Sequence, residues 1–209
     1  MDVSLKARLT GAAPMGGSDR PVECDPFGGL ITGLLGKYGE ACRRGLLFHG
    51  MTAVTGVAPG TALGTTGAFT LSNPINSNVD VVVLQGQMGY VSGTLGAGVV
   101  TWNIGALPTE TAPTGTLILA RNGLSDGPAS RVRAFTTSTI VAPTPIRVFA
   151  SLGASLASSV VAPWTIKDDV DGGIILRPGG NLTLHATAAA GTSPVVVFSA
   201  AWLEIPTLG

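Results

Sequence analysis

The stretch VVVFSAAWLEI, residues 195–205, decides the fold class of this 209-residue chain. Successive side chains of a β-strand point to opposite faces of the sheet, and here both faces are largely apolar. One face carries Val195, Val197, Ser199, Ala201, Leu203 and Ile205, and the other carries Val196, Phe198, Ala200, Trp202 and Glu204. A strand at a sandwich surface would have one polar face. The stretch is therefore either a central strand covered within its own subunit or, as we expect, a strand in contact with a neighbouring subunit, with Phe198 and Trp202 among the contact residues.

Further runs of β-branched and large apolar residues have the composition of strands. With the first stretch, the predicted strands are residues 46–54, 67–73, 79–91, 98–104, 115–122, 131–141, 146–153, 172–177, 181–187 and 195–205. Long, proline-containing connections separate most of them, which favours Greek-key crossings over a simple meander. Only Pro178-Gly179-Gly180 is short enough to predict a hairpin. The sequence thus predicts an all-β fold, a jelly-roll-like sandwich of two antiparallel sheets.

Charged residues are unevenly distributed along the chain. Residues 1–44 hold 11 charged side chains and the remaining 165 residues hold 13. We therefore predict an N-terminal arm with a short helix over residues 1–44 and a β-sandwich domain over residues 45–209. Glycine and proline make the arm extended. The helix is expected within residues 34–45, because Arg43 and Arg44 suit its last turn and Gly45 suits the position after it.

Composition excludes several classes of function. Charged residues make up 11% of the chain and the formal net charge is zero, which argues against capture of nucleic acid or of an anionic membrane. No stretch has the roughly 18 consecutive apolar residues of a membrane-spanning helix, so we do not expect this chain to be a membrane protein. The opening MDVSLKARLT lacks the apolar region of a secretory signal, so we expect folding in the cytoplasm.

Motifs for catalysis and metal binding are incomplete. Residues 123–127, GLSDG, match G-x-S-x-G, but Pro128 and a strand-like run follow where a nucleophile elbow needs a helix, so we interpret them as a turn. Residues 169–172, DVDG, resemble the start of a calcium loop without its bidentate glutamate, and we interpret them as a solvated turn, a loose calcium site being the alternative. The histidines, His49 and His185, have no second ligand nearby in sequence. We predict no enzyme, no cofactor and no metal site.

The two cysteines, Cys24 and Cys42, are expected to be separate thiols, with a disulfide between them as the alternative.

The parts of one sequence pattern are spread over most of residues 35–206. Its parts are the segment from Tyr38 to Gly45, Asn73-Pro74 before a valine-rich strand, Asp169 to Gly172 before the Pro178-Gly179 turn, and Trp202-Leu203-Glu204-Ile205-Pro206. With this pattern the chain resembles a family of tailed-bacteriophage virion proteins, small head-associated jelly-roll proteins of the decoration or cement type.

The resemblance implies a structural protein of the phage head, made in the host cytoplasm, that binds the outer capsid surface and stabilises contacts between capsomers. Its implied partners are the major capsid protein and further copies of itself, as a homotrimer, with no nucleic acid and no membrane. On this hypothesis Tyr38, Arg43 and Arg44 contact the capsid or the adjacent subunit. The alternative is a phage spike, fibre or neck-appendage protein that binds a host-surface glycan through a pocket of clustered aromatic and polar side chains.

Overall fold

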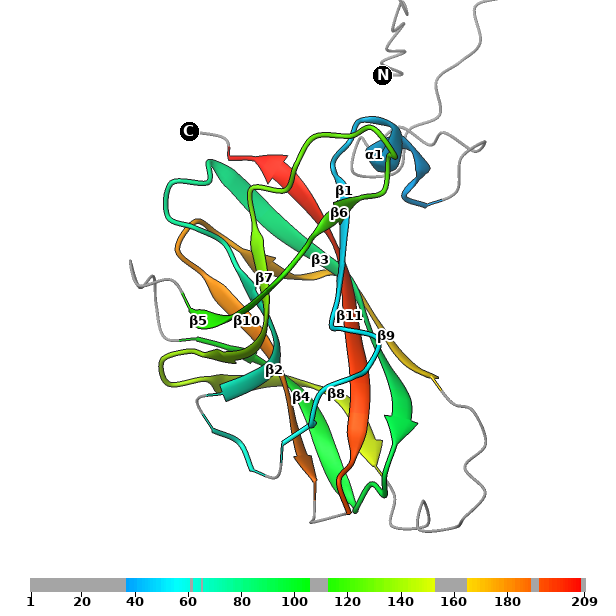
Figure 1. The fold of residues 1–209 in the computed structure, drawn as a ribbon. Helices are drawn as coiled ribbons and strands as arrows, with labels where there is room; N and C mark the ends of the chain where they lie inside the picture. The colour runs from blue at the N-terminus through cyan, green and yellow to red at the C-terminus, as the bar shows by residue number, and fades with distance from the viewer. Residues whose placement is uncertain are drawn as a thin grey trace, which may run out of the picture. The chain divides into compact units, whose positions relative to one another are not determined.

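The computed structural model describes residues 37–60, 62–64, 66–105, 113–152, 165–188 and 192–207. The chain divides into two compact units, Met1–Glu40 and Ala41–Gly209. Only residues 37–40 of the first unit are described, so residues 1–36 of the predicted N-terminal arm lie outside the described residues. The second unit holds all the described strands, and they form two antiparallel sheets (Figure 1).

Eleven strands of the described residues make up the two sheets. The first sheet has the order β6 (Arg121–Asn122), β1 (Leu47–Met51), β11 (Val195–Pro206), β3 (Val79–Ser92) and β9 (Thr165–Leu176). The second has the order β5 (Thr114–Ile118), β7 (Arg133–Thr139), β2 (Thr66–Ser72), β10 (Asn181–Ala188), β4 (Gly98–Ile104) and β8 (Thr144–Leu152). Buried side chains from both sheets form one hydrophobic core. The predicted all-β sandwich of two antiparallel sheets is confirmed.

The connectivity is that of a jelly roll with an insertion. Four strands of each sheet, in the orders β1-β11-β3-β9 and β2-β10-β4-β8, form the two interlocking Greek keys of that fold. The inserted strands lie between β4 and β8 in the chain. Of these, β6 extends the first sheet beside β1, and β7 and β5 extend the second sheet beside β2.

The strand β11 lies in the middle of its sheet, between β1 and β3. Every second residue from Val196 to Glu204 is buried, and the alternate residues from Val195 to Leu203 are partly buried. Phe198 and Trp202 are fully buried in the core of their own chain, so our expectation that they contact a partner is wrong for this structure. The face of β11 that carries Phe198 and Trp202 packs into the core, whereas the face that carries Val195, Val197 and Leu203 is only partly buried.

Two predicted strands, residues 115–122 and 172–177, differ clearly from the structure. Residues 115–122 form two strands, β5 and β6, which lie in different sheets because the chain crosses between sheets at Leu119 and Ala120. The strand predicted over 172–177 begins earlier, at Thr165, so DVDG is part of β9 and not a turn before it. Asp171 and Gly172 have positive φ angles of 50° and 85° and interrupt the pairing of β9 with β3.

The Pro178-Gly179 turn has the predicted geometry but does not join paired strands. The amide of Gly180 donates to the carbonyl of Arg177 at 2.9 Å, and Gly179 has a φ of 88°. However, β9 pairs with β3 whereas β10 pairs with β2 and β4. The predicted hairpin is therefore wrong, and this turn carries the chain from one sheet to the other.

The predicted short helix is α1 (Gly39–Arg43). Gly45 follows it with a φ of 68°, which is readily adopted by glycine. The amide of Gly45 donates to the carbonyl of Cys42, and the amide of Leu46 donates to the carbonyl of Ala41, each at 2.9 Å. These two hydrogen bonds are the Schellman pattern of helix termination.

Candidate interaction surface

Glu204, the lone carboxylate of β11, is buried and serves the fold. Its Oε1 accepts hydrogen bonds from the hydroxyl of Ser130 and from Trp202 Nε1, the latter at 3.2 Å, and its Oε2 accepts from the amide of Arg131 at 2.9 Å. Together these three donors satisfy a group that would be costly to bury alone. The carboxylate thereby fixes the segment before β7 to the end of β11.

Asn73 joins two further parts of the sequence pattern. Its Nδ2 donates to the carbonyls of Val79 at 2.8 Å and Leu176 at 3.0 Å. Its backbone carbonyl accepts from Gly179, and its amide donates to Gly180. Asn73-Pro74 and Pro178-Gly179 therefore meet in space at one end of the sandwich, although about a hundred residues separate them in the chain.

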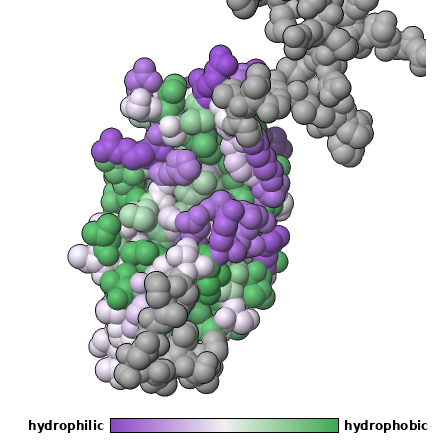
Figure 2. All heavy atoms as spheres, turned by 90° about the vertical axis from the view of Figure 1, so that its right-hand side faces the viewer, coloured by the Kyte–Doolittle hydropathy of each residue, from purple (hydrophilic) through white to green (hydrophobic). Residues whose placement is uncertain are grey.

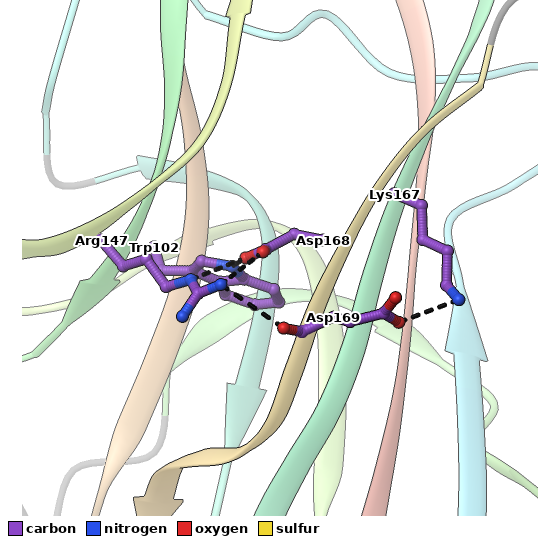
Figure 3. A network of polar contacts seen from close by, with 5 residues as sticks. All are labelled: Trp102, Arg147, Lys167, Asp168 and Asp169. Carbon is purple, nitrogen blue, oxygen red and sulfur yellow. Dashed lines mark hydrogen bonds and ion pairs between the residues drawn. The ribbon is translucent and has the colours of Figure 1, made fainter.

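A network that the sequence did not predict ties the edges of the two sheets together (Figure 3). Arg147 of β8 binds both carboxylate oxygens of Asp168 of β9, at 3.0 Å from Nε and 2.7 Å from its terminal nitrogen. Trp102 Nε1 donates to the same carboxylate at 2.8 Å. Asp168 is a strong acceptor for the guanidinium, and this contact raises the pKa of Arg147. We call Trp102, Arg147 and Asp168 the edge clasp.

The alternation of β9 is the signal that could have identified the edge clasp. Lys167 and Asp169 are exposed and form an ion pair at 2.9 Å, whereas Asp168 lies on the inward face with the buried Val170. A buried tryptophan also needs an acceptor for its N–H. The two aspartates that we considered as calcium ligands, Asp169 and Asp171, are exposed residues of β9. No group of three or more metal-ligating side chains occurs among the described residues.

The segment 123–127 is a turn, as predicted. The side chain of Asn122 organises it, accepting from the amide of Leu124 at 2.8 Å and donating to the carbonyl of Gly45 at 2.7 Å. The amide of Gly127 donates to Leu124 at 3.0 Å, and the next regular element is β7 rather than a helix.

The histidines lie on different sheets. His49 is exposed on β1, and partial burial lowers its pKa. His185 is buried on β10, and its Nε2 has no hydrogen-bond partner among the residues that the structure describes. Burial lowers its pKa. Cys42 of α1 is a free thiol, and Cys24 lies outside the described residues.

The predicted contact residues do not form one site. Arg43 and Arg44 are exposed at the end of α1, and Tyr38 is partly buried just before it. Lys37 Nζ lies 5.3 Å from the centre of the Tyr38 ring, a cation–π contact. Phe198 and Trp202 are core residues of β11, which leaves the segment from Lys37 to Arg44 as the part of the predicted surface that is accessible.

The glycan-binding alternative needs exposed aromatic side chains, but the described tryptophans are buried. Trp102 and Trp202 are fully buried, and Trp164 lies outside the described residues. Trp102 packs edge-on against Phe149, with ring centres 5.9 Å apart, and Trp202 stacks on Phe48 at 6.4 Å. These rings build the core, and a stacking platform for sugars would have to use other side chains.

The surface carries apolar residues at the sheet edges. Exposed examples on or next to edge strands are Leu117, Leu119, Ile146, Val148 and Ile175. Figure 2 shows hydrophilic residues gathered across the middle of one face with hydrophobic residues beside them, so that face is not a single apolar patch.

Comparisons with known proteins give no family assignment. A scan against protein-family models finds no match, and a search of curated proteins finds no significantly similar sequence. Within the described residues, no helix has both the length and the apolar character needed to cross a membrane.

Proposed function

We propose that this chain is a structural protein of a tailed-bacteriophage head that binds the outer capsid surface and stabilises contacts between capsomers. The supporting observation is that some residues of the sequence pattern are buried and others are exposed. Its buried members, Glu204 and Asn73, hold separate segments of the jelly roll together. Its exposed members include Arg43 and Arg44, in the segment from Tyr38 to Gly45, as well as Asp169 and Asp171. A β-sandwich protein with exposed arginines suits a role in binding between large subunits.

In this proposal Arg43 and Arg44 pair with carboxylates of the major capsid protein. Guanidinium groups bind carboxylates with two parallel hydrogen bonds, which favours arginine at protein interfaces. The chain binds the capsid as a homotrimer, a closed arrangement that places three copies of the same segment around one axis. Three weak contacts then act together, and the assembled affinity exceeds that of one copy.

The test measures binding of the full chain to phage heads that lack it, by co-sedimentation. Arg43→Glu with Arg44→Glu should weaken binding by about tenfold or more, because each close charge pair becomes a repulsion. Arg121→Glu with Arg133→Glu is the matched control, since it makes the same charge change at two exposed arginines of the β-body. Equal binding by both double variants, or no binding by the unaltered chain, would contradict the proposal.

A further inference from the structure

Three of the four edge strands carry features that prevent pairing with another chain. Charged side chains, proline, bulges and short length are the common means of protecting a sheet edge. Among the described residues, β6 has only two residues, β8 contains Pro145 and Arg147 with two register shifts, and β9 contains Lys167 and Asp169 with a bulge.

The fourth edge, β5, has no charge and no proline. Its sequence is Thr-Gly-Thr-Leu-Ile, and within the described residues it pairs only with β7. Its one irregularity lies near its start, between Thr114 and Thr116. Leu117 is 62% exposed, and Leu119, directly after the strand, is 65% exposed. Leu117 and Leu119 thus place two exposed apolar side chains at a strand edge that has no further pairing partner among the described residues.

The sequence contains a segment whose alternation of polar and apolar residues suits this edge. Residues 2–10, DVSLKARLT, alternate strictly between polar and apolar side chains, with Val3, Leu5, Ala7 and Leu9 on one face. Their spacing of two residues matches that of Leu117 and Leu119. These residues lie outside the described part of the chain. A strand added at a sheet edge gains backbone hydrogen bonds, and its alternate side chains give specificity.

We propose that residues 2–10 of one copy add as a strand to the β5 edge of a second copy, with their apolar side chains against Leu117 and Leu119. Residues 11–36, fully extended, span up to about 85 Å. A body of this size has a radius of gyration of about 15 Å, so the connecting segment is long enough to reach a neighbour.

This contact is head-to-tail, because one copy gives the segment and the next gives the edge. Such contacts close into a ring when the rotation between copies allows it, and a trimer is the ring that fits the proposed function. The strand exchange itself does not depend on the virion role. It concerns only copies of this chain and can be tested without capsids.

The first test is the mass of the full chain in solution, measured by sedimentation equilibrium over a range of concentrations. The unaltered chain should be a trimer. Leu117→Lys should weaken association by about tenfold or more, because it replaces a buried leucine contact with a charge on the edge. Val148→Lys is the matched control on β8, since Val148 is also an exposed apolar edge residue, at 59%. A monomeric unaltered chain, or equal association of the two variants, would overturn the proposal.

The donor segment is tested in the same way. Leu5→Asp with Leu9→Asp should weaken association as Leu117→Lys does, whereas Ser4→Asp with Thr10→Asp, on the polar face of the same segment, should leave it unchanged. Unfolding midpoints verify that all variants fold. If the Ser4 and Thr10 double variant weakens association more than the Leu5 and Leu9 double variant does, the assignment of residues 2–10 is refuted.

Mixing two single-cysteine chains tests whether the strand comes from another copy. In a background with Cys24→Ser and Cys42→Ser, one chain carries Leu117→Cys and the other carries Val3→Cys, Leu5→Cys or Leu9→Cys. Paired strands bring opposite Cα atoms within about 5.5 Å, close enough for a disulfide. We expect an oxidised heterodimer from at least one of the three mixtures. If no mixture cross-links, the exchange between copies is excluded.

Discussion

Glu204 shows that a carboxylate in an otherwise apolar strand can have a structural role. A lone carboxylate in an apolar strand is a candidate acid or base, but here three donors from two segments surround it. The carboxylate can accept all three hydrogen bonds without any donor of its own, which matches its surroundings. Its neighbour in the pattern, Trp202, is one of the donors, and this explains why the two residues occur together.

Glu204→Gln should lower the free energy of unfolding by about 1–3 kcal/mol, because the amide nitrogen faces donors and leaves at least one buried group without a partner. Urea denaturation measures the change. Asp126→Asn is the matched control, as it removes one exposed carboxylate from the preceding turn, and should change stability by less than about 0.5 kcal/mol. Equal stability of the two variants would show that the Glu204 network contributes little.

His185 makes stability depend on pH. Burial lowers its pKa from the ordinary value of 6.5, so the unfolded chain takes up this proton at a higher pH than the folded chain does. The free energy of unfolding should therefore fall as the pH drops through about 6.5, and the loss is complete below the folded-state pKa. His185→Gln should show a smaller fall between about pH 7.5 and about pH 5 in urea denaturation. The same fall in both proteins would contradict this assignment.

At the scale of elements, the edge clasp joins two strands that do not pair. Arg147 of β8 is 44% exposed in its side chain, whereas that of Asp168 of β9 is 12% exposed. Exposed ion pairs contribute little to stability. A buried N–H that loses its acceptor costs considerably more. The hydrogen bond from Trp102 to Asp168 therefore matters more than the ion pair itself.

We accordingly predict a ranking of two substitutions. Asp168→Ala should lower the free energy of unfolding by about 2 kcal/mol, because it leaves Trp102 Nε1 buried without an acceptor. Arg147→Ala should lower it by less than about 1 kcal/mol. Both values come from urea denaturation. A larger effect of Arg147→Ala would mean that the ion pair, rather than the tryptophan contact, holds the two edges together.

Local patterns predicted the strands well because alternation and turn residues act within a few neighbouring positions. All the predicted strand segments contain a strand, and Gly45 ends the helix as expected. Which strands pair with one another was harder to predict from the sequence. The sequence around Pro178-Gly179 specifies a turn, but Asn73, far away in the chain, binds that turn where β9 passes into β10. The edge clasp was missed for the same reason, since its members come from three strands.

At the scale of the whole molecule, the face of β11 that carries Phe198 and Trp202 belongs to the core, so these two side chains are not evidence of subunit contact. We instead propose assembly from the β5 edge, which pairs only with β7 among the described residues, and from the exposed Arg43 and Arg44. These features lie on different parts of the chain and serve different partners in our account. One joins copies of the chain, and the other binds the capsid.

The most direct measurement is a cryo-electron microscopy reconstruction of the phage particle that contains this chain. We predict jelly-roll density on the outside of the head, bridging neighbouring capsomers, with the segment from Tyr38 to Gly45 against the capsid protein. Density for the chain only at a fibre or spike, or no density for it anywhere on the particle, would contradict the account.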